Sequence, residues 1–412
     1  MKIAMKKIFI SIITSAVLTL TSCSKDDGTT SETPAIIPPV AVVDPVTPQN
    51  VRTFMVDPNA TDETVALFYN LRKLSQTKFA IGHQDAFAGF YTSSGDSDIK
   101  KTTGHDPALL GSDFMFITDK NNNGQASNWF FQQETNIIDD AKEAKSKGMI
   151  NVFCWHLREP NNEDSFYAAD ITAAQQQTAF RSIMPGGAKH EWYKTKLDKV
   201  ASIVSNMRDA NNKLIPIIFR PFHEFDGSWF WWGSNYCAPD EYKAVFQFTV
   251  DYLKNTKNVH NLLYSFSPDN TYTTSSSYLN RYPGDAYVDV LGMDNYGDLN
   301  NQGTSGATNA NNKLKYLSDL AISKKKIAAL TETGYRVTNT TPAVPNWFST
   351  YLYDAITNNG VQIGFVMFWA NGNGGYYVPT PTTSNAADFN SFVIKPKSVL
   401  QNTLPNMYVL PN

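Results

Sequence analysis

Short apolar runs alternate with longer amphipathic stretches along the chain from about residue 51 onward. The apolar runs are rich in β-branched and aromatic residues, which favour strands, and they are nearly continuous, which indicates burial on both faces of a parallel sheet. Eight of these runs predict strands, at residues 79–84, 114–118, 149–156, 214–222, 262–267, 288–295, 327–332 and 363–370.

Amphipathic stretches between these runs predict helices at residues 128–147, 193–211, 241–254, 313–324 and 347–357. Asp240 precedes one of these helices as a start signal, and Gly148 and Gly360 follow two others as stop signals. Eight strand–helix units in roughly 350 residues are the number in a (β/α)8 (TIM) barrel. We therefore predict a single α/β domain of this fold over residues 51–412, with an open, doubly wound sheet as the alternative.

The first 22 residues have the pattern of a secretory signal. Three lysines precede an apolar stretch over residues 8–20, which is too short to span a bilayer comfortably. The sequence Leu20-Thr21-Ser22-Cys23 that follows resembles the lipobox of bacterial lipoproteins, in which the cysteine is lipidated. The alternative is an ordinary signal peptide with a chance cysteine. Residues 24–27 resemble the acidic tract that directs some lipoproteins to the cell surface, so we expect an outer-membrane lipoprotein on the cell surface, with the periplasmic face as the alternative.

Residues 23–50 predict a tether that begins at the lipidated cysteine. The segment contains five prolines among Thr, Val and Ser, a composition that favours extended, hydrated conformations. The two remaining cysteines, Cys154 and Cys237, are too few for a disulfide framework or a cysteine-rich metal site. The sequence leaves open whether they form a single bridge.

Charge and composition narrow the classes of partner. The net charge is −3 and no basic block occurs outside the signal, so the chain lacks the electrostatic footprint of a nucleic-acid-binding protein. Charged residues make up 18%, below the roughly 25% of ordinary soluble domains, while aromatic residues make up 13%. Such a composition favours neutral polar partners, among them sugars.

Nearly every predicted strand ends in polar or aromatic groups, and the carboxyl ends of the strands carry the active site in a barrel of this kind. These groups are His83-Gln84-Asp85, Asp119, Trp155-His156, His223-Glu224, Asp269-Asn270, Asp294-Asn295-Tyr296, Glu332 and Trp369. Glu224 and Glu332 end the fourth and seventh strands, where a carboxylate is costly unless it has a partner. They are either structural ion pairs with nearby arginines or an acid and a nucleophile that face each other. Four large aromatic residues at 229–232 follow Glu224 and favour sugar stacking.

Two segments carry a family resemblance. Residues 220–233, with the sequence RPFHEFDGSWFWWG, resemble the acid/base signature of glycoside hydrolase family 26, and residues 331–334, TETG, resemble its nucleophile segment. The histidine before the glutamate is informative, because most families of that clan have asparagine there. The resemblance covers about residues 51–405 and implies a (β/α)8 retaining glycosidase. Members of the family are chiefly endo-β-1,4-mannanases, with some mixed-linkage glucanases and xylanases.

The resemblance also implies roles for individual residues. Glu224 is the expected general acid/base and Glu332 the expected nucleophile, with Tyr296 bonded to Glu332. The expected substrate-site residues are His156, His223, Trp229, Asp294, Tyr296 and Trp369. Retention requires carboxyl groups roughly 5–5.5 Å apart, one protonated and one charged. We expect Arg and Tyr donors to lower the pKa of Glu332, and aromatic packing to keep Glu224 protonated.

Other motifs are incomplete. Residues 119–124 match the first half of an EF-hand loop, but Phe130 occupies the position of the essential glutamate. The histidines lack zinc-protease spacing and no nucleotide-binding motif is complete, so we expect neither metal nor cofactor. The polar stretch 158–189 follows the third predicted strand, and it either shapes a distal subsite over the cleft or is a surface insertion without a role.

Taken together, these features predict a lipid-anchored, monomeric, retaining β-mannanase whose partners are a β-mannan and a membrane. The same machinery acting on mixed-linkage β-glucan or β-xylan is the first alternative. A catalytically dead surface glycan-binding lipoprotein is the second, although a binding protein has no need of both Glu224 and Glu332.

Overall fold

The computed structural model describes residues 44–87, 95–372 and 374–411. The predicted signal peptide, Cys23 and most of the predicted tether therefore lie outside the described residues. A compact unit begins at Asp44. Among the described residues, every helix is too short or too polar to cross a bilayer.

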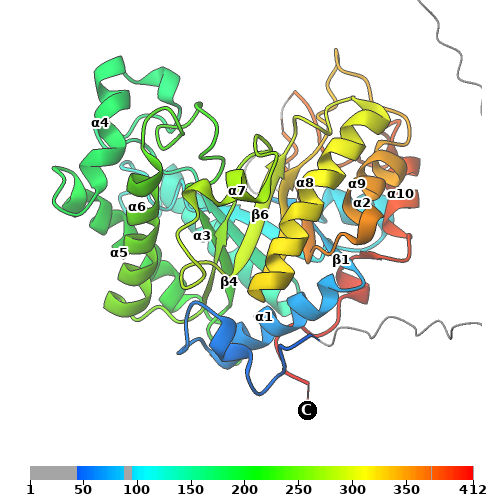
Figure 1. The fold of residues 1–412 in the computed structure, drawn as a ribbon, viewed down its shortest axis with the longest axis horizontal. Coiled ribbons are helices and arrows are strands. Elements are labelled where there is room, and N and C mark those ends of the chain that lie inside the picture. The colour runs from blue at the N-terminus through cyan, green and yellow to red at the C-terminus, as the bar shows by residue number, and fades with distance from the viewer. Residues whose placement is uncertain (1–43, 88–94, 373, 412) are drawn as a thin grey trace, which may run out of the picture. The chain divides into compact units, whose positions relative to one another are not determined.

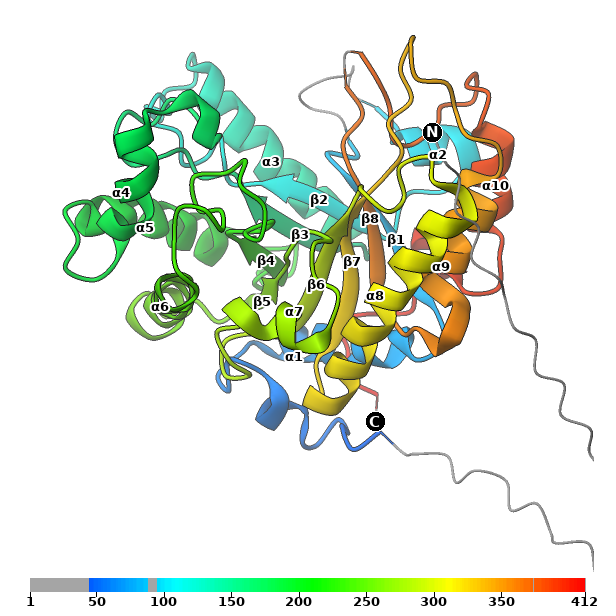
Figure 2. The same cartoon turned by 45° about the horizontal axis from the view of Figure 1, so that its top comes forward.

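Eight parallel strands form a closed barrel, because β1 pairs with both β8 and β2 (Figures 1 and 2). The strands are β1 (Phe79–Gln84), β2 (Leu109–Asp113), β3 (Ile150–Trp155), β4 (Ile217–Pro221), β5 (Leu262–Phe266), β6 (Val290–Asn295), β7 (Ile327–Thr333) and β8 (Phe365–Phe368). A two-residue strand, β9 (Ser398–Val399), also pairs with β1. The predicted (β/α)8 barrel is confirmed.

Helices connect the strands and pack outside the barrel. They are α1 (Asp62–Ser75), α2 (Asp98–Thr103), α3 (Trp129–Ser146), α4 (Ala173–Ile183), α5 (His190–Asn206), α6 (Pro239–Asp251), α7 (Ser275–Tyr278), α8 (Gly303–Lys324), α9 (Tyr353–Thr357) and α10 (Ala386–Val393). A π-helical turn, Tyr252–Thr256, extends α6, and another, Trp347–Leu352, precedes α9.

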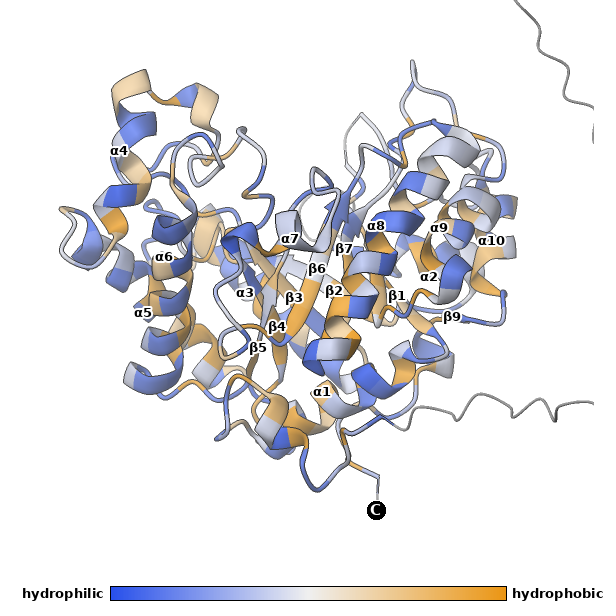
Figure 3. Ribbon diagram, in the orientation of Figure 1, coloured by the Kyte–Doolittle hydropathy of each residue, from blue (hydrophilic) through white to orange (hydrophobic). Residues whose placement is uncertain are grey.

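Side chains alternate between the inside and the outside of the barrel, as strand geometry requires. Ile218 and Ala329 point inward and belong to one apolar cluster with α1, whereas Phe219 and Leu330 belong to the layer beneath the outer helices. Figure 3 shows apolar residues along the strands and on α1. Because α1 closes the end at which the strands begin, functional groups gather at the opposite end.

The chain before α1 also packs against the domain. Val46 is buried, and Asp44 pairs with Arg72 and accepts a hydrogen bond from Gln76, both on α1. Residues 44–50, assigned to the tether from their composition, thus pack with the barrel.

The second strand was predicted wrongly. Residues 114–118 were expected to form it, but β2 is Leu109–Asp113, and Phe114 and Ile117 pack outward after the strand has ended. Residues 114–118 are more strand-like in composition than Leu-Leu-Gly-Ser. In the folded chain they nevertheless belong to the connection that follows β2, where Phe114 and Ile117 are buried in the layer beneath the outer helices. The correction matters because Asp113 now stands at a strand end, facing the site.

Helix α8 begins ten residues before the predicted start at 313, in a stretch of Gly, Thr, Ser, Ala and Asn that has little helical periodicity. Gly306 permits this first turn, because a Cβ atom there would lie 1.9 Å from the Asp298 carbonyl oxygen.

Candidate active site

A tight turn after β4 carries Glu224 to the barrel mouth. Phe222 and Glu224 both have left-handed backbone conformations, with φ of 51° and 52°, which non-glycine residues seldom adopt. The Glu224 amide donates to the Ser267 carbonyl, and the Trp229 indole Nε1 donates to Glu224 Oε2 at 2.7 Å. The turn therefore fixes both the backbone and one oxygen of Glu224.

A bulge in β7 aims Glu332 into the site. In the pairing with β6, Met293 is opposite Leu330 but Asp294 is opposite Glu332, so Thr331 is an extra residue on β7. Ile327 and Ala329 point into the barrel, and under strict alternation Glu332 would point outward. The register shift turns it toward the mouth, as bulges commonly do near active sites.

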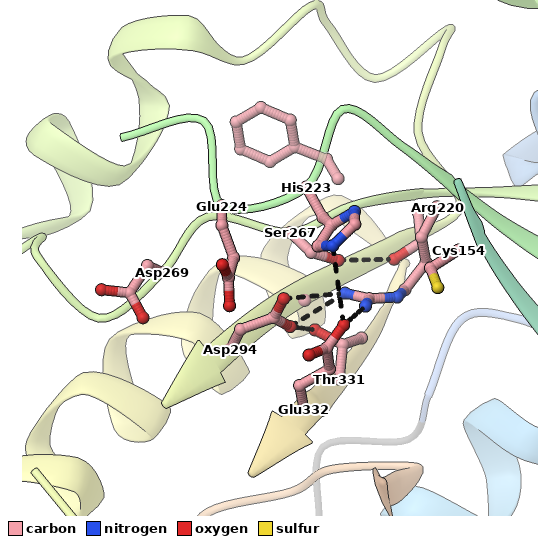
Figure 4. A network of polar contacts seen from close by, with 12 residues as sticks. Cys154, Arg220, His223, Glu224, Ser267, Asp269, Asp294, Thr331 and Glu332 are labelled. Carbon is pink, nitrogen blue, oxygen red and sulfur yellow. Dashed lines mark hydrogen bonds and ion pairs between the residues drawn. The ribbon is translucent and has the colours of Figure 1, made fainter. Parts of the chain in front are cut away.

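Glu332 is almost fully buried and has a donor on each oxygen, of which Figure 4 shows the Arg220 guanidinium. Arg220, on β4, forms an ion pair with its Oε1, and the Tyr296 hydroxyl donates to its Oε2 at 3.1 Å. The predicted contact between Tyr296 and Glu332 is thus present. Both donors stabilise the charged carboxylate.

Asp294 lies beneath this pair and holds the guanidinium in place. Arg220 donates to both of its oxygens, at 2.8 and 3.1 Å, and the Thr331 hydroxyl donates to Oδ1 at 2.6 Å. The Asp294 side chain has no exposed surface, so the geometry suits a positioning role for it rather than direct contact with a ligand.

Two histidines form a buried pair beside Glu332. His223 Nε2 lies 3.2 Å from His156 Nε2 and 3.8 Å from Glu332 Oε1. Asp113 holds His156 by accepting hydrogen bonds from its backbone amide at 3.1 Å and from its Nδ1 at 2.6 Å. Burial favours neutral His156, but Asp113 outweighs this and raises its pKa, whereas burial and His156 lower the pKa of His223. These opposite directions favour His156 as the donor in the contact between the two rings.

The two glutamates have unequal surroundings. Burial, followed by the charge of Glu332, raises the pKa of Glu224 well above its usual range, and the Trp229 indole opposes this only in part. Burial and the charge of Asp294 raise the pKa of Glu332 to about 8, against the influence of Arg220, His156 and the Tyr296 hydroxyl.

The expected lowering of the pKa of Glu332 is therefore wrong in net sign, because Arg220 is shared with Asp294 and burial exceeds its effect. Within residues 44–87, 95–372 and 374–411, Glu332 nevertheless has a guanidinium partner and Glu224 has none, so the geometry favours a charged Glu332 facing a protonated Glu224.

Only part of the aromatic run at 229–232 is accessible. Trp229 is exposed, whereas Phe230, Trp231 and Trp232 are buried. Trp369 is half-buried after β8, with its ring centroid 5.8 Å from that of His156. These positions bring Trp229 and Trp369 to the same mouth as the two glutamates.

With this geometry established, sequence comparison gives the family. The family described as "Glycosyl hydrolase family 26" matches residues 56–348. The chain belongs to this family. It is 33% identical over 369 residues to a mannan endo-1,4-β-mannosidase of Bifidobacterium adolescentis, covering 84% of this chain but only 35% of that protein. The chain thus spans about one third of the length of that relative.

Solved structures agree with the assignment to family 26. The structure of GH26C from a Muricauda species has 56% identity and a TM-score of 0.88, covering 89% of this chain and 99% of that one. An endo-β-1,4-mannanase of Cellulomonas fimi has 30% identity and a TM-score of 0.77, covering 86% of this chain and 79% of that one.

Reasoning from the sequence missed one supporting residue of this family 26 site. Asp113 was missed because the second strand was predicted at 114–118; the available signal was an acid directly after the short buried run Leu109-Leu110-Gly111-Ser112. Arginine donors to Glu332 were expected, but the sequence did not show that the guanidinium of Arg220 also joins Glu332 to Asp294.

Two groups among the described residues bring three metal-ligand types together: Asp113, Cys154 and His156, and His223, Asp294 and Glu332. In the first group, His156 already pairs with Asp113, and burial raises the pKa of the Cys154 thiol and so disfavours the thiolate. In the second, Arg220 supplies the positive charge. Both sets therefore suit a hydrogen-bond network better than a cation.

Two remaining questions from the sequence have answers here. Cys154 and Cys237 are both buried and free, so they form no bridge with each other. In the half EF-hand loop, Asp119 pairs with Arg158 and accepts hydrogen bonds from Asn121, so an arginine occupies the place of a cation.

Proposed function

We propose that the protein hydrolyses internal β-1,4-mannosidic linkages in mannan, galactomannan or glucomannan by retaining double displacement. The observation that carries this proposal is the unequal pair of glutamates at the barrel mouth. Glu332 is held by Arg220 and Tyr296, whereas Glu224 is half-buried beside Trp229 and has no cationic partner among the described residues. The names of the Bifidobacterium and Cellulomonas relatives support mannan as the substrate.

In the first step, Glu332 attacks the anomeric carbon while Glu224 donates its proton to the leaving oxygen. The glycosidic bond breaks as the bond from C1 to the Glu332 carboxylate forms, and Glu224 becomes an anion. In the second step, Glu224 removes a proton from water, the hydroxide oxygen bonds to C1, and Glu332 leaves as a carboxylate. Two inversions restore the original configuration.

The neighbouring residues support these steps in distinct ways. The indole N–H of Trp229 orients Glu224, and Tyr296 and Arg220 orient the two oxygens of Glu332. His223, held through His156 and Asp113, lies beside Glu332 and is placed to contact the sugar at the cleavage site. We assign Trp369 the role of a flat surface for that sugar.

The test is hydrolysis by the purified full-length protein of galactomannan, glucomannan, mixed-linkage β-glucan and xylan, followed by product sizing. Products from the mannans alone support the proposal. Products from mixed-linkage glucan or xylan alone overturn the substrate but keep the mechanism. Binding without products from any of the four overturns the enzyme and favours a glycan-binding protein. Glu332→Gln is the matched inactive control.

We further propose that Cys23 is lipidated and anchors a monomer to the outer membrane. The support is the lysine-rich start, the apolar stretch and the Leu-Thr-Ser-Cys sequence. Labelled palmitate should be incorporated into the wild type but not into Cys23→Ala, and the variant should leave the membrane fraction. Digestion by protease added to intact cells distinguishes the cell surface from the periplasmic face.

A further inference from the structure

Trp129 is the most exposed tryptophan among the described residues, with 49% of its surface accessible, and the proposed reaction does not use it. It is the first residue of α3. Phe116 and Phe130 lie nearly perpendicular to it, with centroid distances of 5.1 and 5.0 Å and interplanar angles of 81° and 87°. Two perpendicular contacts fix the orientation of the indole while much of its surface stays open. Its N–H makes no hydrogen bond within the described part of the chain.

The surface beside Trp129 is neutral and rich in amides. Residues 121–128 have the sequence Asn-Asn-Asn-Gly-Gln-Ala-Ser-Asn and are mostly exposed. The Asn128 side chain accepts from the Phe131 amide at 3.1 Å and donates to the Asn121 carbonyl at 3.0 Å. Asn122 donates to buried Glu134 at 2.6 Å. These hydrogen bonds fix the loop against α3, and the exposed side chains of residues 121–128 offer amides and a hydroxyl to the solvent.

This loop lies at the same end of the barrel as the glutamates, because it joins the carboxyl end of β2 to α3. It is linked to the segment after β3 by ion pairs of Arg158 with Asp119 and of Lys120 with Asp164.

The segment after β3 in turn pairs with the loop that carries Trp229. Tyr167 and Phe230 form a β-bridge, and the Ala168 amide donates to the Trp229 carbonyl at 2.7 Å. A continuous rim of bonded loops therefore leads from Glu224 to Trp129.

We propose that Trp129 is a platform for a sugar of the polysaccharide substrate that lies several units from the bond being cleaved. The inference rests on the proposed function and extends it with a distal subsite. The exposed half of the Trp129 indole suits the C–H face of a pyranose, and the neighbouring amides suit the hydroxyls of the sugar. A charged ligand finds no compensating cluster in residues 121–128, where every side chain is neutral.

The experiment compares wild type, Trp129→Ala and Trp129→Phe on mannooligosaccharides of increasing length and on galactomannan. Tyr316→Ala is the control, since Tyr316 is an exposed aromatic residue on α8. Trp129→Ala should raise KM for polymer and the longest oligosaccharides about threefold to tenfold, with kcat and short-chain kinetics unchanged. Trp129→Phe should restore part of the loss, and Tyr316→Ala should match wild type.

An equal loss of kcat/KM in Trp129→Ala at every chain length would indicate a structural role and overturn the proposal. Unchanged kinetics at every length would also overturn it and would favour a protein as the partner of this surface. Mannohexaose binding to Glu332→Ala, measured with and without Trp129→Ala, separates this inference from the proposed function. Weaker binding without any wild-type hydrolysis would refute the enzyme but keep the platform. Hydrolysis by wild type, together with equal mannohexaose binding by Glu332→Ala and by the Glu332→Ala, Trp129→Ala double variant, would keep the proposed enzyme and refute the platform.

Discussion

Asp294 and Glu332 face each other on adjacent strands and share a single guanidinium, that of Arg220. Two acids and one fixed cation in a buried site leave an excess negative charge. That excess contributes to raising the pKa of Glu332, which must nevertheless be ionised to attack. The pH dependence of the proposed hydrolysis should therefore be set partly by Asp294, which holds the guanidinium of Arg220.

Replacing Asp294 with Asn tests this relationship. The charge of Asp294 raises the pKa of Glu332, so its removal lowers that pKa, and Glu332 stays ionised to lower pH. The acid limb of kcat/KM should accordingly move to lower pH, as a full pH profile would reveal. An acid limb that stays in place or moves upward would contradict the shared-guanidinium account.

Asp269 makes a complementary prediction for the alkaline limb. In Figure 4, Asp269 lies beside Glu224, on the side away from Arg220 and Glu332. The charge of Asp269 contributes to raising the pKa of Glu224. Asp269→Asn should lower the pKa of Glu224, so that the acid loses its proton at lower pH and the alkaline limb of kcat/KM moves downward. The acid limb of Asp269→Asn should stay at its wild-type pH, so the acid limb of the same profile serves as the control for the movement of the alkaline limb.

Trp229→Phe should have the opposite effect on the same limb. The indole N–H donates to Glu224 and favours the charged form, so its loss raises the pKa of Glu224 and moves the alkaline limb upward. Opposite movements in Trp229→Phe and Asp269→Asn would identify Glu224 as the titrating acid. Movement in the same direction would argue against it.

The two glutamates should differ in chemical rescue. With a dinitrophenyl β-mannobioside, Glu332→Ala should lose at least about a hundredfold in rate, and added azide should yield the inverted glycosyl azide. Glu224→Ala should form the glycosyl-enzyme but hydrolyse it slowly, and azide should then give the retained product. NMR of the anomeric configuration of each glycosyl azide assigns the nucleophile and the acid/base. A retained azide from Glu332→Ala and an inverted azide from Glu224→Ala would mean that Glu224 is the nucleophile and Glu332 the acid/base.

Nearly continuous apolar runs separated by amphipathic stretches were sufficient to predict most of the barrel, because seven of the eight predicted strands overlap the observed ones. The second strand failed because Phe114 and Ile117 form a strand-like run that packs outside the barrel. The hydrophobic pattern records burial, and it does not distinguish a buried strand from a buried turn.

Glu224 and Glu332 could be predicted because each lies at the carboxyl end of a buried strand and within a recognisable motif. The hydrogen bonds that Asp113 accepts from His156 could not be predicted, since they join the ends of two neighbouring strands and depend on register. Nor could the sequence tell which aromatic of residues 229–232 is exposed, because the path of the turn decides it.

The left-handed backbone of Phe222 and Glu224, in the turn after β4, lowers the stability of the folded protein where the proposed activity needs a glutamate. A bulky or acidic residue at positive φ costs of order 1 kcal/mol relative to glycine, and both Phe222 and Glu224 are held in this way. Glu224→Gly should therefore melt at a higher temperature than Glu224→Ala while being equally inactive, as calorimetry of the two proteins would measure. The chain keeps its proton donor at a position where the backbone alone would favour glycine, so gains in thermal robustness at this turn come at the expense of turnover.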